Sequence, residues 1–163
     1  MLAPDRAQHI RSLGPVDQQL RILQSREGFR QGHFAEHPEG TQPDARSVVL
    51  REKQAEGEGL FRLVLADPQG GVLPAWSAGA HVDLIAGGFR RKYSLCGEAN
   101  DRSCLQVVVQ READGRGGSR HFCDQLEVGT VLQLSGPKNL FKLDESARHF
   151  VLFAGGIGIT PIV

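Results

Sequence analysis

The chain has 163 residues, of which 40% are apolar, and its 19 basic residues balance 19 acidic ones. This length is sufficient for one ordinary domain with a core and a short appendage. Because the net charge is zero, no overall field attracts nucleic acid or an anionic membrane, and no run reaches the roughly 18 apolar residues of a membrane span, so neither partner is expected.

Residues 1–43 differ in character from the rest of the chain. Between Leu13 and Leu23 the apolar residues form a weak helical stripe that Gly14-Pro15 interrupts, and residues 32–43 are rich in Gly, His, Pro and Glu. The stripe favours a helix, and the polar Gly/Pro stretch favours a linker. We therefore expect residues 1–43 to form an N-terminal helical extension and a linker.

Residues 44–147 are predicted to form a mainly β domain. Short runs of alternating or apolar residues are separated by clusters of Gly, Pro, Asp and Glu that are typical of turns. These runs predict six antiparallel strands in a small barrel or sandwich, at residues 47–53, 59–66, 81–86, 90–95, 105–111 and 130–135.

One short helix is predicted among these strands. Ser119 is suited to cap a helix, and the apolar residues Phe122, Cys123 and Leu126 have the spacing of one helical face. The pattern predicts a helix over Ser119–Leu126 that closes one end of the barrel.

Residues 148–163 have the pattern that begins an α/β nucleotide-binding domain. An apolar run over His149–Ala154 predicts a buried strand, and Gly155-Gly156-Ile157-Gly158 follows it as a glycine-rich turn. The helix that should come next lies beyond Val163, so we expect only the first strand and loop of a truncated domain. Without neighbouring strands, the side chains of residues 150–153 should be exposed.

Two segments carry residues suited to a flavin. The predicted fourth strand holds Arg91, Tyr93 and Ser94, which offer a fork for a phosphate, an aromatic ring and a hydroxyl for the ring edge. A second segment, Gly115–Ser119, is a glycine loop that leads into the predicted helix and can hold a phosphate. Taken alone, the first segment is more typical of an ordinary strand with solvated arginines, and the second is more typical of an ordinary turn.

The order of these segments points to a known family. Arg91-Lys92-Tyr93-Ser94, then Gly117-Gly118-Ser119, then Ala154-Gly155-Gly156-Ile157-Gly158-Ile159-Thr160-Pro161 closely resembles the ferredoxin-reductase superfamily of flavoprotein reductases. Within it, the chain is most similar to the phthalate dioxygenase reductase and vanillate demethylase reductase family. Gly79-Ala80-His81 and Cys96 agree with that family. The resemblance covers roughly residues 45–162.

The resemblance implies a six-stranded antiparallel Greek-key barrel that binds flavin, most simply FMN. FAD is less expected, because no insertion able to hold an adenine follows the phosphate loop. By analogy, the phosphate, ribityl chain and ring would contact Arg91, Lys92, Tyr93, Ser94, Val108, Val109, Gln110, Gly117, Gly118 and Ser119. The start of the dinucleotide site would be Gly155, Gly156, Gly158 and Thr160.

The resemblance also implies the chemistry of a longer parent protein. NAD(P)H would deliver a hydride to the flavin, which would pass single electrons to a 2Fe-2S cluster and on to an oxygenase or ferredoxin partner. The expected function is therefore an oxidoreductase that transfers electrons and needs no catalytic acid or base. The alternative is a remnant or binding module without catalysis, which retains only the barrel.

The cysteines and histidines suggest no metal site in this chain. The three cysteines have neither the number nor the spacing of an iron–sulfur site, so the cluster is expected only in the parent. The histidines lack metal-ligand spacing, apart from His33 and His37 in the Pro/Gly linker. An odd number of cysteines at irregular spacing favours reduced thiols that pack in the core, and hence a cytoplasmic location.

Overall fold

The computed structural model describes residues 44–163. The helical extension and linker expected over residues 1–43 lie outside the described residues. None of the helices in the described part is long and apolar enough to cross a membrane.

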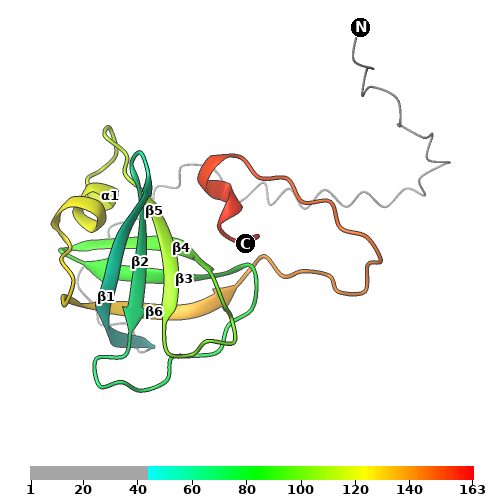
Figure 1. Cartoon of the computed structure of the whole chain (residues 1–163), viewed down its shortest axis with the longest axis horizontal. Helices are drawn as coiled ribbons and strands as arrows, with labels where there is room; N and C mark the ends of the chain where they lie inside the picture. Colours follow the sequence, from blue (N-terminus) through cyan, green and yellow to red (C-terminus); the bar gives the residue numbers. More distant parts are fainter. Residues whose placement is uncertain (1–43) are drawn as a thin grey trace, which may run out of the picture. The chain divides into compact units, whose positions relative to one another are not determined.

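Six antiparallel strands form a closed barrel, in the order β1-β2-β5-β4-β3-β6 (Figure 1). The strands are β1 (Ala45–Gly57), β2 (Leu60–Ala66), β3 (Ala80–Ala86), β4 (Phe89–Cys96), β5 (Leu105–Gln110) and β6 (Val131–Asn139). The expected mainly β fold with a six-stranded antiparallel barrel is confirmed, and the sandwich is excluded.

β1 and β6 end well beyond the residues at which the sequence pattern predicted their ends. β1 continues to Gly57, because its polar second half pairs with β2 in a two-stranded ribbon. There Arg62 of β2 joins Gln54 through Nη2 at 2.6 Å and Glu56 through Nε at 2.6 Å. β6 continues to Asn139, where it pairs with Ala80. Polar cross-strand contacts hold these segments, and such contacts leave no apolar alternation in the sequence.

The core lies inside the barrel and is built from alternating positions of the strands. Val82 and Leu84 of β3 and Leu132 and Leu134 of β6 are buried, for example, as the period of two along a strand requires. Phe122 is fully buried and belongs to the same cluster.

Phe122 comes from a helical segment that packs against β4 and β5. The segment consists of α1 (Gly118–Arg120) and a π-helical turn, η1 (His121–Gln125). A helix is confirmed here, but Ser119 does not cap it. The cap is Gly117, whose φ of 87° lies in the left-handed region that glycine favours. Ser119 is the second residue of α1, and its Oγ instead accepts a hydrogen bond from the Glu112 N–H at 3.1 Å.

The strand predicted over His149–Ala154 is wrong. Residues 148–155 have no regular structure, and Gly156–Ile159 forms a short 3-10 helix, η2. A strand of a parallel sheet exists only beside neighbouring strands, and the described residues pair none with this segment. The expected exposure of the apolar side chains is confirmed, since Val151 is 72% and Phe153 88% exposed.

Truncating Phe122 should destabilise the barrel. Phe122→Ala removes a fully buried ring and leaves a cavity, so we expect it to lower the free energy of unfolding by about 3–5 kcal/mol. Urea unfolding followed by the fluorescence of Trp76, the single tryptophan, measures this. Val128→Ala, at a 60% exposed position, is the control and should change the value by less than about 0.5 kcal/mol. A loss below about 1 kcal/mol for Phe122→Ala would show that the helix is not part of the core.

Candidate functional site

Arg91 carries a positive charge that no acid neutralises in the described chain. Its neighbour Arg90 points to the other face of β4, where Nη2 contacts the buried Asp83 at 2.7 Å. The half-buried Arg91 makes no ion pair within residues 44–163, and its Nη1 donates only to the carbonyl of Arg90 at 2.8 Å. A guanidinium that keeps its remaining donors free is suited to an anion.

The guanidinium of Arg91 lies against the start of α1. A Cβ built on Gly118 would overlap the Arg91 Nε, so the two segments approach this closely only because residue 118 has no side chain. The first N–H groups of a helix have no acceptor within the helix. The structure therefore brings two predicted phosphate-binding elements together, Arg91 and the Gly117–Ser119 loop, although they come from separate segments of the chain.

The sheet opens beside these residues. β4 and β5 pair only at Leu95 with Val107 and at Cys96 with Gln106. If pairing continued, Ser94 would face Val108 and Tyr93 would face Val109, but residues 108–110 pair only with β2 on their other side. The edges of β4 and β5 that face each other thus keep free backbone groups. We call this opening, between residues 91–94 and residues 108–110, the seam.

Two hydroxyl groups on the β4 side of the seam have no protein partner. The Tyr93 ring packs edge-on against Phe122, with the ring centroids 5.6 Å apart, and neither the Tyr93 nor the Ser94 hydroxyl makes a hydrogen bond within the described part of the chain. Burial raises the pKa of Tyr93, so the phenol stays neutral and can donate. Ser94 lies opposite His81 in the β3–β4 register, and burial lowers the pKa of His81.

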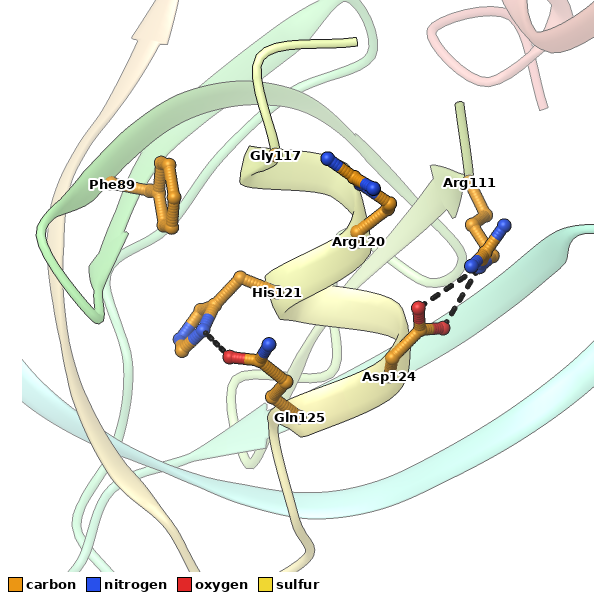
Figure 2. A pocket seen from close by; sticks show the side chains of 7 residues that line it. All are labelled: Phe89, Arg111, Gly117, Arg120, His121, Asp124 and Gln125. Carbon is orange, nitrogen blue, oxygen red and sulfur yellow. Dashed lines mark hydrogen bonds and ion pairs between the residues drawn. The ribbon is translucent and has the colours of Figure 1, made fainter. Parts of the chain in front are cut away.

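A groove next to the Gly117–Ser119 loop contains residues that the sequence analysis missed. It has a volume of about 430 Å³ and is lined by Phe89, Arg111, Gly117, Arg120, His121, Asp124 and Gln125 (Figure 2). Arg111 Nε contacts both carboxylate oxygens of Asp124, at 2.9 and 3.0 Å, and His121 Nδ1 contacts Gln125 Oε1 at 2.9 Å. The Arg111 contact lowers the pKa of Asp124. The only sequence signal was the presence of Arg111 and Arg120 at the ends of predicted segments.

The remaining predicted site residues are accessible or buried to different degrees. Lys92 and Gln110 are exposed, Val108 is half-buried and Val109 is buried, so the last could contribute only backbone groups to a ligand. At the chain end, Cβ atoms on Gly155, Gly156 and Gly158 would meet open space. Thr160 is buried, and its hydroxyl donates to the Ile157 carbonyl at 3.0 Å, which closes the 3-10 turn.

The cysteines fit a packing role. All three are buried and unpaired, and burial raises the pKa of Cys96 and raises that of Cys123 to about 11. These two thiols therefore stay protonated near neutral pH. Within residues 44–163, no three His, Cys, Asp or Glu side chains are grouped to hold a metal ion.

Comparisons with known proteins identify chains that are similar to this one over most of its length. No family model matches the chain. The phthalate 4,5-dioxygenase reductase subunit of Pseudomonas putida is 47% identical over 117 residues, which are 71% of this chain and 36% of the relative. The vanillate O-demethylase oxidoreductase of Pseudomonas putida is 43% identical over 117 residues, with the same coverage of 71% and 36%.

A solved structure agrees with these relatives. Phthalate dioxygenase reductase, described as a modular structure for electron transfer from pyridine nucleotides to [2Fe-2S], superimposes with a TM-score of 0.70 at 39% identity. The match covers 72% of this chain and 37% of that structure. The barrel is therefore of the type found in oxidoreductases that transfer electrons. Over the matched residues, the chain is similar to phthalate dioxygenase reductase and vanillate O-demethylase oxidoreductase.

Alkaline titration of Tyr93 should measure how well its ring is buried against Phe122. Tyr93 is the only tyrosine, so the phenolate absorbance belongs to it alone. Because burial raises its pKa in the folded state, the folded protein should show no phenolate at about pH 10, where an unfolded tyrosine is half ionised.

The linkage follows from proton binding. Above about pH 10 the unfolded state loses the proton that the folded state keeps, so stability should fall as pH rises, and unfolding should accompany ionisation. A Tyr93→Phe variant should give no signal and should lose this component of the pH dependence. Half ionisation at about pH 10 in the still folded protein would mean that Tyr93 is open to solvent.

Proposed function

We propose that this barrel binds FMN and serves as the flavin domain of an NAD(P)H-dependent reductase, which passes electrons through a 2Fe-2S centre to an oxygenase or ferredoxin. The chain spans 36% of the length of the curated relatives it matches, so this activity is proposed for the whole protein. The contact between Arg91 and Gly118 is the observation that carries the proposal.

The residues present fit the phosphate of a flavin mononucleotide. Arg91 has no acid partner in the described residues, and it lies on the bare backbone of Gly118, where the first N–H groups of α1 are nearby. A guanidinium and backbone N–H groups together bind phosphate oxygens well. Ser119 can add its proton, because its oxygen accepts the Glu112 N–H and its own O–H is left to donate.

The seam fits the other end of the same ligand. A planar ring along it could receive hydrogen bonds from the Ser94 hydroxyl and from the free backbone edge of residues 108–110, and Tyr93 could contact the ribityl chain. When bound, the flavin would supply the exchange between a two-electron donor and one-electron acceptors. The protein residues would bind, orient and shield it, and none need act as an acid or base.

The nicotinamide site is proposed for the chain end. Gly155, Gly156 and Gly158 have open space around them, and a backbone without side chains allows a pyrophosphate to approach closely. Lys92 is proposed as an accessory residue at the rim of the flavin site. The unpaired thiols are in keeping with a cytoplasmic protein.

An absorbance spectrum of the purified full chain, followed by heat release of any bound cofactor, tests the proposal directly. Flavin bands and release of FMN are expected. Release of FAD would change the cofactor and keep the reductase proposal. A colourless chain that does not take up added FMN or FAD would contradict the flavin site and favour a remnant or binding module without catalysis, which retains only the barrel.

Arg91→Gln should weaken the binding of FMN selectively. Loss of one charge-assisted contact to phosphate should raise the FMN Kd by about 10-fold to 100-fold, whereas the Kd of riboflavin, which has no phosphate, should hardly change. Flavin fluorescence titration measures both values. Arg46→Gln, at an exposed position on β1, is the matched control. Equal losses for FMN and riboflavin would assign Arg91 a structural role only.

Gly118→Ala should also weaken the binding of FMN and not that of riboflavin, but by displacing Arg91 rather than by removing its charge. The added methyl group would displace the Arg91 guanidinium, which is the flexible end of its side chain, so we expect a stability loss below about 1 kcal/mol but a clear loss of FMN affinity. Gly57→Ala is the control, because its Cβ would be 3.9 Å from Leu60. Wild-type FMN affinity in Gly118→Ala would contradict the proposed phosphate site.

A further inference from the structure

A second guanidinium lies next to the loop that Arg91 contacts. Arg120 follows Ser119 on α1, and its Nη2 is 4.0 Å from the position that a Cβ on Gly117 would occupy. The next residue, Gly118, is the one against which Arg91 lies. Two guanidinium groups, from β4 and from α1, are therefore directed at consecutive glycines.

Arg120 also has no acid partner of its own in the described chain, although its charge helps to lower the pKa of Asp124. Within residues 44–163 Arg120 makes no ion pair or side-chain hydrogen bond, whereas the nearest acid on the same helical segment, Asp124, is held by Arg111 through both of its oxygens. Arg111 and Asp124 neutralise each other. Arg91 and Arg120 thus bring two guanidinium groups to the loop, and neither is in an ion pair within the described residues, although the Arg91 guanidinium also lies over the Phe89 ring, 5.5 Å from its centroid.

There is space for an anion beside Arg120. The groove of about 430 Å³ reaches from Gly117 past Arg120 to the Arg111–Asp124 pair (Figure 2). Phe89 and His121 form the other side, with their ring centroids 5.5 Å apart. A phosphate on the Gly117-Gly118 backbone would therefore be close to both guanidinium groups.

We propose that Arg120 is a second phosphate-binding residue, and that Arg91 and Arg120 together select a terminal phosphomonoester dianion. This inference rests on the proposed function and names the form of its ligand. A phosphomonoester carries nearly two negative charges above its second pKa of about 6, and two guanidinium groups match them. FAD spreads its two charges over two phosphates, and riboflavin has none. The pair therefore favours FMN over both.

The test is flavin titration of the full-length wild type and Arg120→Gln at about pH 5.5 and about pH 7.5, on either side of the second phosphate pKa. At the higher pH we expect Arg120→Gln to bind FMN about tenfold more weakly and riboflavin as the wild type does. FMN affinity should rise with pH in the wild type, and most of this rise should be lost in the variant. Arg120→Lys should restore part of it, and Arg46→Gln should behave as the wild type.

Titration with FAD distinguishes the ionisation of the ligand phosphate from the ionisation of protein groups. The titratable and charged groups near the loop are Arg91 from β4, Arg111 and Glu112 after β5, Arg116 directly before Gly117, and Arg120, His121 and Asp124 from the helical segment. FAD has no phosphate ionisation near pH 6, so the pH dependence of FAD binding reports the ionisation of the protein alone. In the wild type, affinity for FMN should rise more with pH than affinity for FAD does. In Arg120→Gln, the two affinities should rise by the same factor.

The outcomes distinguish the two proposals. Wild-type FMN affinity and an unchanged pH dependence in Arg120→Gln would overturn the role of Arg120 and leave the flavin site intact. A wild type that binds FMN no better than riboflavin would overturn the selection of a dianion. If the wild type binds none of the three flavins, the proposed function and this inference both fail.

Discussion

The contact between Arg91 and the backbone of Gly118 is the constraint on which the candidate site depends, since it joins a barrel strand to a helix that follows the next strand. It needs a bare glycine at residue 118, and it needs α1 to be held in place. Phe122 is buried in the core and so holds the helical segment in place. Lys53 of β1 donates a hydrogen bond of 3.0 Å to the carbonyl of Leu126, the residue that follows the helical segment. Burial of an aromatic ring stabilises the fold by more free energy than the exposed Arg111–Asp124 ion pair does, so the core is the main determinant of the position of the loop.

The same arrangement explains why the barrel can have an open seam without losing its closure. β4 needs only two paired residues with β5, because it is also paired with β3 along six residues from Phe89 to Ser94. Side chains from the inner face of β4 then pack under the helix rather than across the sheet, as Tyr93 does against Phe122. The free backbone edges cost little here, because they lie at the surface, where water or a ligand can satisfy them.

The sequence predicted the strands and one helix well, because alternation and turn residues are local signals. It could not predict the extension of β1, since residues such as Gln54 and Glu56 are polar and gain a strand only through cross-strand partners. The strand predicted over His149–Ala154 is wrong for a related reason. An apolar run of this kind forms a strand only beside neighbouring strands, and none pairs with it in the described residues. Within the site, Arg91 and the glycine loop were found through their spacing, but Arg120 was not, because only the fold shows which arginines lack an acid.

The proposed ligand would be recognised by two different physical means at its two ends. The seam offers donors and backbone groups whose positions are set by the register of β4 and β5, so it discriminates by shape and hydrogen bonding. The Gly117–Ser119 loop offers charge, and charge acts over several ångströms with little demand on geometry. Substitutions at the loop should therefore change affinity more than the position of the ring, whereas substitutions along the seam should act on the ring and its electronic properties. A reductase needs affinity and ring orientation to be set by separate residues, because the ring must keep one orientation toward its electron partners, whereas the phosphate only anchors the ligand.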